Sequence, residues 1–300
     1  GCGFRFLWKR VLRTHGEPPP ERTLDLEPRE IGSLVHEVLR ELFHALSRER
    51  LLPLSATALG PARARLAPIL DRLVAAQPGR IGEGPVALWQ ARRRRILEDL
   101  EEFLEREVAS AEKWRPIDLE VAFGDPEPLV VEIGGERLAV RGRIDRIDER
   151  PGAVRIVDYK TGRLGEDSEQ PGSIAGGQRL QLPLYRLALE RWRGERRPLH
   201  GALLGVTSKS DFRRVEWSPT HFEQAADLLG HAVHGIVSGI DAGEFFQVER
   251  DRFCDAVCEW STVCGPGRRR VIAAKSDDPR VAAADSWRSD RAGRGGEDES

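Results

Sequence analysis

The sequence lacks methionine altogether and contains no long apolar run. No stretch approaches the ~20 apolar residues of a membrane-spanning helix, and the N-terminus GCGFRFLWKRVLR shows no signal-peptide pattern. We therefore expect a cytoplasmic protein without a membrane partner. Because the chain opens on Gly-Cys and has no Met, we also expect it to be a segment of a longer reading frame.

Lysine is scarce, and the formal net charge is only −2. A near-neutral chain has no global basic footprint, so a nucleic-acid partner has to be argued from local sites. Only five of the 47 Lys and Arg residues are lysines. One of them, Lys160, lies two residues after Asp158. Because a lysine amine can lose its proton in suitable surroundings and Arg cannot, this placement suggests amine chemistry.

Hydrophobic periodicity predicts an α/β domain over residues 1–266, followed by a disordered, mixed-charge tail over 267–300. Long helices are expected over 28–47 and 86–108, and short helices broken by Pro and Gly over 49–85, so that 49–117 form a helical lobe. From residue 118 alternation predicts an antiparallel meander. The expected strands cover 118–123, 128–133, 137–147, 153–160, 201–207 and 213–217, and two further helices cover 178–193 and 219–240.

The stretch RGRIDRIDERPGAVRIVDYKTG, residues 141–162, reads as a β-hairpin around Pro151-Gly152. With these two residues as the turn, the numbers of paired residues sum to 303, so Asp145 faces Asp158. Because side chains alternate between the two faces of a strand, Lys160 lies on the same face as Asp158. Like charges opposite one another are destabilising, and a divalent cation such as Mg²⁺ would relieve the repulsion. The alternative is a shifted register, with both aspartates in solvent and Lys160 as an ion-pair partner.

Three blocks together closely resemble the RecB/AddB-like branch of the PD-(D/E)XK nucleases: GRIDRID around Asp145, IVDYKTG around Asp158, and QLPLY from Gln181 to Tyr185. Gly32-Ser-Leu-Val-His36 matches the G-x-x-x-H motif of that family. One departure is Ile144, where the family's nominal motif has Pro. The resemblance implies a restriction-endonuclease-like mixed β-sheet flanked by helices, with an N-terminal helical lobe.

The resemblance also implies metal-dependent hydrolysis of DNA with Mg²⁺ or Mn²⁺. Lys160 would orient or deprotonate the attacking water, Gln181 and Tyr185 would position Lys160 or the DNA backbone, and Glu120 could add a further acidic group. It implies two overlapping sets of site residues: catalytic Asp145, Asp158, Lys160, Gln181 and Tyr185, and metal-ligating His36, Asp145, Asp158 and the backbone carbonyl of Tyr159.

The four cysteines lie near the two ends of the sequence, as Cys2, Cys254, Cys258 and Cys264. In a cytosolic protein this pattern suggests metal binding rather than disulfides, and the spacing suits either zinc or an iron-sulfur cluster. AddB-type nuclease domains carry one Cys before the first helix and three after the last, so the resemblance implies a 4Fe-4S cluster. Zinc and unliganded thiols are the alternatives, because Gly3 replaces the usual Pro and the C-x3-C spacing is one residue longer than the family's commonest form.

As a whole, the resemblance implies an exonuclease that processes DNA ends in double-strand-break repair, as the nuclease portion of a helicase-nuclease. The chain has no G-x-x-x-x-G-K-[ST] phosphate loop, so the helicase would be another domain or a partner subunit. A catalytically inactive DNA-end-binding or scaffold module is the alternative. A penicillin-binding serine enzyme is disfavoured because Ser210-Asp211-Phe212 follows, rather than precedes, Lys160-Thr-Gly162.

Overall fold

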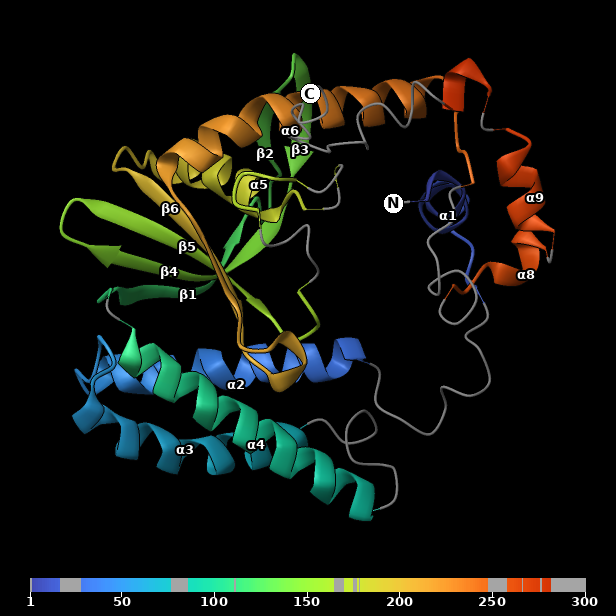
Figure 1. Ribbon diagram of the computed structural model, residues 1–300. Coiled ribbons are helices and arrows are strands. Elements are labelled where there is room, and N and C mark those ends of the chain that lie inside the picture. The colour runs from blue at the N-terminus through green and yellow to red at the C-terminus, as the bar shows by residue number, and fades with distance from the viewer. Residues whose placement is uncertain are drawn as a thin grey trace, which may run out of the picture.

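The computed structural model describes residues 2–16, 28–76, 86–110, 112–164, 170–174, 177, 179–247, 258–265, 267–275 and 277–281. In this part of the chain a five-stranded mixed sheet lies between two layers of helices (Figure 1). The helices are α2 (Pro28–Arg48), α3 (Ala56–Ala75) and α4 (Val86–Ala109) on one face, and α5 (Gln181–Ala188), η4 (Leu189–Arg193) and α6 (Pro219–Asp241) on the other. The predicted α/β fold with a helical layer before the sheet is confirmed.

The sheet has the strand order β1-β4-β5-β6-β7. Its strands are β1 (Arg115–Phe123), β4 (Gly142–Arg150), β5 (Ala153–Lys160), β6 (Leu199–Gly205) and β7 (Arg214–Trp217), and η5 (Ser208–Ser210) lies between the last two. Neighbouring strands are antiparallel except β5 and β6, which run parallel. A parallel pair needs a crossover connection, and here the connection contains α5.

The predicted antiparallel meander is wrong, because β1 pairs directly with β4. The expected strand over 137–147 is divided at Arg141 into β3 (Glu136–Val140) and β4, and β3 pairs with β2 (Leu129–Ile133) in a separate two-stranded sheet. Val131 and Ile133 of this hairpin pack against Leu229 and Val233 of α6. Burial of the hairpin against α6 therefore draws it away from the main sheet.

The expected short helices over 49–85 are also wrong, because α3 is one helix of 20 residues that contains Pro61 and Pro68. A proline inside a helix costs about 3 kcal/mol. The helix nevertheless continues because its inward face is buried at helical spacing, and each buried leucine contributes about 1.5–3 kcal/mol. The buried residues of α3 are Ala58, Ala62, Leu66, Leu70 and Leu73.

Two hydrophobic cores lie on opposite faces of the sheet. Val157 and Tyr159 of β5 belong to the core shared with α2–α4, whereas Ile156 belongs to the core shared with α5 and α6. Because successive strand residues point to opposite faces, Asp158 and Lys160 lie on the α5 side of β5. The end of β5 is held in place by β6, since Val206 N donates to Lys160 O at 3.0 Å.

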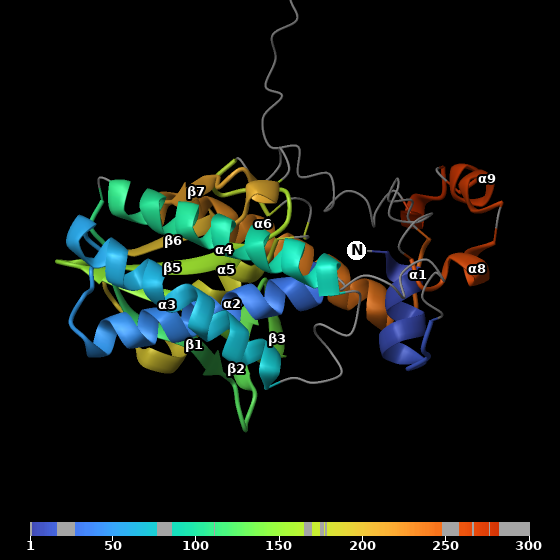
Figure 2. The same ribbon diagram turned by 90° about the horizontal axis from the view of Figure 1, so that it is seen from below.

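The two ends of the described chain lie side by side. The N-terminal α1 (Gly3–Phe6) and η1 (Leu7–Val11) lie next to α8 (Ser261–Cys264) and α9 (Arg268–Ala273) in both views (Figures 1 and 2). Phe4 N donates to Phe246 O at 3.1 Å, and Trp260 Nε1 donates to Thr14 Oγ1 at 3.4 Å.

Helix α9 is formed where the sequence predicts disorder from residue 267 onward. Its six residues are three arginines followed by Val271, Ile272 and Ala273. Residues 282–300 lie outside the described part, and the prediction for them stays a prediction. Among the described helices, none combines the length and apolarity that crossing a bilayer would need.

Candidate active site

The hairpin register predicted from the sequence is confirmed. Arg150 pairs with Ala153 and Arg146 with Val157, so every pair in the ladder sums to 303. Continued by one residue, this register brings Asp145 of β4 across from Asp158 of β5. Gly152, at the turn, has φ +78°, a conformation that glycine adopts without steric cost.

Asp145 is tied to the end of β5 by the backbone. Tyr159 N donates to Asp145 Oδ2 at 2.7 Å, in a position where a regular ladder would use a carbonyl acceptor. Asp145 is 8% exposed and Asp158 only 2%. The two carboxylates are therefore held close together at the buried end of the hairpin.

Lys160 connects Asp158 to α5. Its Nζ forms an ion pair with Asp158 Oδ2 and donates to Gln181 Oε1 at 2.6 Å. Gln181 is the first residue of α5, and Tyr185 one turn later is buried against Phe123 at a ring-centroid distance of 6.0 Å. The structure thus brings Asp158, Lys160 and Gln181 into one contiguous polar chain.

His36 of α2 approaches the same point from the opposite layer. His36 Nδ1 lies 3.4 Å from Asp145 Oδ1 and 3.9 Å from Glu120 Oε1. One ligand atom from each of His36, Glu120 and Asp145 lies within 4.8 Å of the others. The His36 ring also packs edge-on against the Tyr159 ring, with centroids 5.7 Å apart, which fixes its orientation.

Glu120 reaches this group through an irregular backbone. It lies between Leu119 and Val121, which pair with Arg146 and Ile144, so it sits across from Asp145 on β1. Its φ is +50°, in the left-handed region that non-glycine residues seldom adopt. Residues with such a strained backbone cluster at functional sites. They persist there because contacts with the surrounding structure hold the unfavourable conformation. Through this conformation Glu120 lies across from Asp145, in the group that His36 joins.

The pKa values of these groups reflect a crowded, acidic and buried environment. Burial raises the pKa of Asp158 to about 6 although Lys160 opposes the shift, and the Asp145 charge adds to it. Burial and the Asp145 charge raise the pKa of Glu120 as well. Burial alone would lower the pKa of His36, but its hydrogen bond to Asp145 and the neighbouring carboxylates raise it. The negative charge of the carboxylates in this site is therefore not fully compensated.

The donor set suits a divalent cation. Oxygen ligands from carboxylates are typical of Mg²⁺ and Mn²⁺ sites, and one imidazole is compatible with a transition metal such as Mn²⁺. Asp158 Oδ2 is buried, and the Lys160 amine forms an ion pair with it. This oxygen could coordinate a bound cation, which would also relieve the repulsion among the carboxylates. His36, Glu120, Asp145 and Asp158 are the residues that could hold it.

Gly32, one turn before His36, lets α2 approach the end of β5. A Cβ on Gly32 would lie 3.1 Å from Thr161 Oγ1, whereas a Cβ on Gly60 in α3 would have nothing within 4 Å. Replacing an exposed helical Gly by Ala stabilises a protein by about 0.5–1 kcal/mol. We expect this gain for Gly60→Ala and a clearly smaller one for Gly32→Ala, measured by urea unfolding. Equal gains would show that α2 does not need glycine at this approach.

Tyr159 has a second environment that the motif does not indicate. Its hydroxyl accepts from Arg146 Nη1 at 3.0 Å, and burial raises its pKa. Its backbone carbonyl as a metal ligand stays a prediction. Burial also raises the pKa of Tyr185, with the charges of Asp158 and Asp145 adding to the shift. Both tyrosines are therefore neutral hydrogen-bonding groups around the acidic site.

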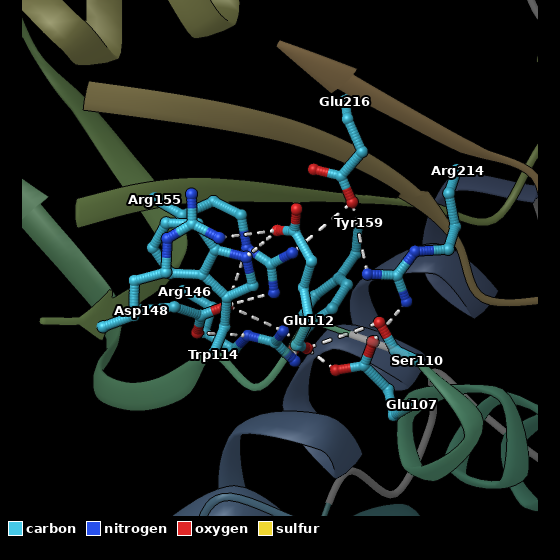
Figure 3. A network of polar contacts seen from close by, with 11 residues as sticks. Glu107, Ser110, Glu112, Trp114, Arg146, Asp148, Arg155, Tyr159, Arg214 and Glu216 are labelled. Atoms are coloured by element: carbon cyan, nitrogen blue, oxygen red, sulfur yellow. Dashed lines mark hydrogen bonds and ion pairs between the residues drawn. The ribbon is translucent and has the colours of Figure 1, made fainter. Parts of the chain in front are cut away.

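A buried network of ion pairs lies behind Tyr159 (Figure 3). Asp148 is fully buried and accepts from Arg146 Nη2 at 2.9 Å and from Arg155 Nη2 at 2.6 Å. Glu107 of α4 accepts from Arg146 at 2.9 Å and from Arg214 at 2.7 Å. Burial alone would raise the pKa of Glu107, but the charges of these arginines lower it to about 2.

Sequence reasoning did not identify this network. The sequence did indicate one of its ion pairs. The same register, in which the numbers of paired residues sum to 303, places Asp148 directly across from Arg155. Opposite charges facing each other on a hairpin are an ordinary surface feature, however, and the sequence does not show that this face is covered by α4.

The structure leaves the cysteine cluster undemonstrated. Cys2, Cys258 and Cys264 are free thiols of intermediate exposure, and Cys254 lies outside the described residues. Within the described part, no three cysteine sulfurs lie within 4.8 Å of one another. The chain ends that carry them are nonetheless adjacent (Figure 2). Near them, Lys9 Nζ lies 3.7 Å from Glu259 Oε2.

Comparison with known families identifies the superfamily of this chain. The model of the PD-(D/E)XK nuclease superfamily matches residues 1–265, a range that includes His36, Asp145, Asp158 and Lys160. The chain belongs to the PD-(D/E)XK nuclease superfamily. The mixed sheet is therefore the scaffold of a nuclease superfamily domain.

Individual relatives agree with this assignment. One, from Symbiobacterium thermophilum and named as an ATP-dependent helicase/deoxyribonuclease subunit, is 33% identical over 202 residues, 63% of this chain and 16% of the relative. Proteins of the same name from Carboxydothermus hydrogenoformans and Oceanobacillus iheyensis are 42% identical over 82 residues and 28% identical over 228 residues. These matches cover 25% and 67% of this chain and 7% and 18% of the relatives, so the chain spans less than a fifth of their length.

A solved structure, that of SSO0001, aligns over 76% of this superfamily member and 96% of its own chain, at 17% identity and a TM-score of 0.28. That score is too low to inform the fold.

Proposed function

We propose that this chain is a metal-dependent deoxyribonuclease domain that hydrolyses phosphodiester bonds. The observation that carries the proposal is the convergence of His36, Glu120 and Asp145 on the point where Asp158 pairs with Lys160. A metal-binding acidic group beside a held lysine is the arrangement that this hydrolysis needs, because an attacking water and a charged phosphoryl group must be brought together.

The carboxylates and the imidazole would hold Mg²⁺ or Mn²⁺, which neutralises charge on phosphoryl oxygens and lowers the pKa of water. Lys160 acts on the attacking water: its amine orients that water or takes its proton. Gln181 holds the amine at 2.6 Å, so that Lys160 does not fold entirely onto Asp158. Tyr159 N fixes one oxygen of Asp145, which leaves the other directed toward His36.

The biological context follows from the relatives rather than from the site. They are named as helicase/deoxyribonuclease subunits, and this chain corresponds to a small part of them. We therefore propose that the domain acts with a helicase domain or subunit, as an exonuclease on DNA ends during double-strand-break repair. The alternative, an inactive end-binding or scaffold module, would bind DNA without cutting it.

Cleavage of labelled linear DNA tests the proposed activity. The wild-type chain is expected to cut in Mg²⁺ or Mn²⁺ and to stop in EDTA, and Lys160→Gln should lose at least about 100-fold in rate because the water loses its positioning group. The control is Lys209→Gln, which removes the same charge from an exposed position on η5 and should cut normally. DNA binding without cleavage in either metal would support the scaffold alternative instead.

We also propose that Cys2, Cys254, Cys258 and Cys264 bind a 4Fe-4S cluster. Support comes from the adjacency of the chain ends: Phe4 N donates to Phe246 O, and Cys2 Sγ lies 3.9 Å from the same carbonyl oxygen. A cluster would join these segments covalently through the metal and stabilise their contact.

The visible spectrum of anaerobically purified protein tests the cluster. We expect a broad brown absorption and bound iron, both lost in Cys264→Ser, while Ser261→Ala in the same short helix should keep them. A colourless protein that contains zinc would replace the cluster with a zinc site. A protein with neither metal would show that the thiols are unliganded.

A further inference from the structure

A pocket of about 230 Å³ lies beside the proposed catalytic lysine, between the end of β5 and the start of α5. Its walls come from the connection after Lys160, from the first turn of α5 and from β6 and β7. The described residues that line it are Lys160, Arg163, Leu164, Gln170, Ser173, Arg179, Gln181, Leu182, Leu203 and Trp217.

The charge of this pocket is opposite to that of the acidic site. Among the described residues that line it there are three cationic side chains, those of Lys160, Arg163 and Arg179, and no carboxylate. Arg and Lys side chains only donate hydrogen bonds, and the amide and hydroxyl groups of the lining can also donate. Lys160 shares its charge with Asp158, and Arg163 and Arg179 add positive charge to the same pocket. The pocket is thus suited to an anion.

The floor of the pocket is apolar. Leu164, Leu182, Leu203 and Trp217 are all less than 9% exposed. Trp217 packs on Phe222 of α6 with ring centroids 5.2 Å apart, so it is part of the core beneath the pocket. An apolar floor lowers the local dielectric and strengthens the attraction between an arginine and an anion. The floor also offers a surface to the carbon atoms of a sugar.

The pocket shares two side chains with the proposed active site. Lys160 and Gln181, which are hydrogen-bonded to each other at 2.6 Å, line the pocket on one side and adjoin Asp158 on the other. A group held in the pocket therefore lies next to the phosphate on which Lys160 acts. The volume is below the 300–1,000 Å³ typical of pockets for drug-sized ligands, which suits one phosphate and part of its sugar.

We propose that this pocket binds a phosphate group of the DNA strand adjacent to the phosphate that is hydrolysed, with Arg163 and Arg179 as its main ligands. The proposal extends the proposed nuclease function and depends on it for the identity of the strand. Arg is well suited to the role, because its planar guanidinium donates two parallel hydrogen bonds to one phosphate. Two bound phosphates would fix the strand in register with Lys160.

DNA binding without metal tests the pocket separately from cleavage. The probe is an internally labelled single-stranded oligonucleotide, titrated in EDTA between about 50 and 200 mM salt. We expect Arg163→Gln to weaken binding about 3- to 10-fold and to reduce the slope of log K against log [salt] by about 0.7, the value of one phosphate contact on a single strand. Arg163 is exposed, so this variant should fold normally. Adding Arg179→Gln should weaken binding further, without lowering the slope by more than this one phosphate contact.

Arg196→Gln is the matched control. Arg196 is exposed and lies just before β6, whose start pairs with Val154 at the far end of β5. Val154 and Lys160 are six positions apart along β5, about 20 Å. The control removes the same charge and should leave affinity and salt slope unchanged. An equal loss in Arg196→Gln, or no loss in either pocket variant, would overturn the proposal.

Three DNAs distinguish the source of the phosphate: a linear strand with a 5′-phosphate, the same strand with a 5′-hydroxyl, and a circular strand. An equal loss with all three assigns the pocket to an internal phosphodiester, and a loss only with the first assigns it to a terminal phosphate. Either result places a strand phosphate in the pocket. A failure of the nuclease proposal looks different, because the wild-type chain would then be inactive in Mg²⁺ and Mn²⁺ while the binding losses remained.

Discussion

Asp158→Asn is expected to abolish metal-dependent DNA cleavage, with a loss of about 10³-fold or more in rate. Asp158 is 2% exposed, and its Oδ2 forms an ion pair with Lys160. The substitution keeps the shape of the side chain and removes its charge. It should therefore weaken binding of Mn²⁺ by at least about 100-fold. Loss of a residue that only contacts a ligand already costs about 10- to 100-fold in metal affinity, and here a ligand itself is lost.

The same substitution should not unfold the protein. Burial raises the pKa of Asp158 to about 6, which means that the folded state disfavours its charged form at neutral pH. A neutral amide removes that penalty, so the metal-free variant should resist urea at least as well as the wild type. Stability that is kept or gained while activity is lost distinguishes a functional carboxylate from a structural one.

Asp227→Asn is the control for this prediction. Asp227 is exposed on α6, and its backbone carbonyl oxygen lies 2.9 Å from His231 Nδ1. We expect normal cleavage, Mn²⁺ binding and stability. An Asp158→Asn variant that cuts DNA like this control would remove Asp158 from the mechanism, and one that fails to fold would make its role structural.

Asp148→Asn is expected to cost about 3–5 kcal/mol of unfolding free energy, the second large effect. Asp148 is fully buried and is the shared acceptor of Arg146 and Arg155, which are 1% and 2% exposed. Removing its charge leaves two buried guanidinium groups with less compensation. The carboxylates that remain are Glu107 for Arg146 and the more exposed Glu216 for Arg155.

The matched control is Asp71→Asn. Asp71 accepts from Arg93 Nε at 2.6 Å and Nη2 at 2.7 Å, but its side chain is 52% exposed, so the pair is screened by solvent. A surface pair of this kind contributes under about 1 kcal/mol. Urea unfolding of both variants measures the difference. Equal and small losses would show that the buried network in Figure 3 does not stabilise the fold.

The network also bears on the active site. Arg146 donates to the Tyr159 hydroxyl at 3.0 Å, and Tyr159 N in turn holds Asp145 Oδ2 at 2.7 Å. Arg146 further lies over the Phe43 ring of α2, at 5.0 Å from its centroid, and α2 carries His36. Breaking the network should therefore loosen both β4 and α2 at the point where they supply site residues.

The sequence was most informative where the physics is local. The Pro151-Gly152 turn fixes the hairpin register, and the register alone determines that Asp145 faces Asp158 and that Lys160 joins them. The Gln181 contact with Lys160 was expected only through the resemblance, because the connection between β5 and α5 has no periodic pattern. The structure brings the two side chains together at 2.6 Å.

Features decided by long-range packing could not be predicted. Nothing near Arg141 shows that β2 and β3 leave the sheet to pack on α6, and Pro61 and Pro68 locally favour a broken helix that burial keeps whole. Glu120 likewise joins the site through a positive φ, which a glutamate side chain does not favour. In each case tertiary contacts outweigh the local preference.

A crystal structure of the protein soaked in Mn²⁺ tests the central claim most directly, because the anomalous signal of manganese locates the ion without reference to activity. The account predicts an anomalous peak about 2 Å from carboxylate oxygens of Asp145 and Asp158 and from the His36 imidazole, adjacent to Lys160. A crystal in which Mn²⁺ occupies other positions while these carboxylates stay without an ion would contradict it.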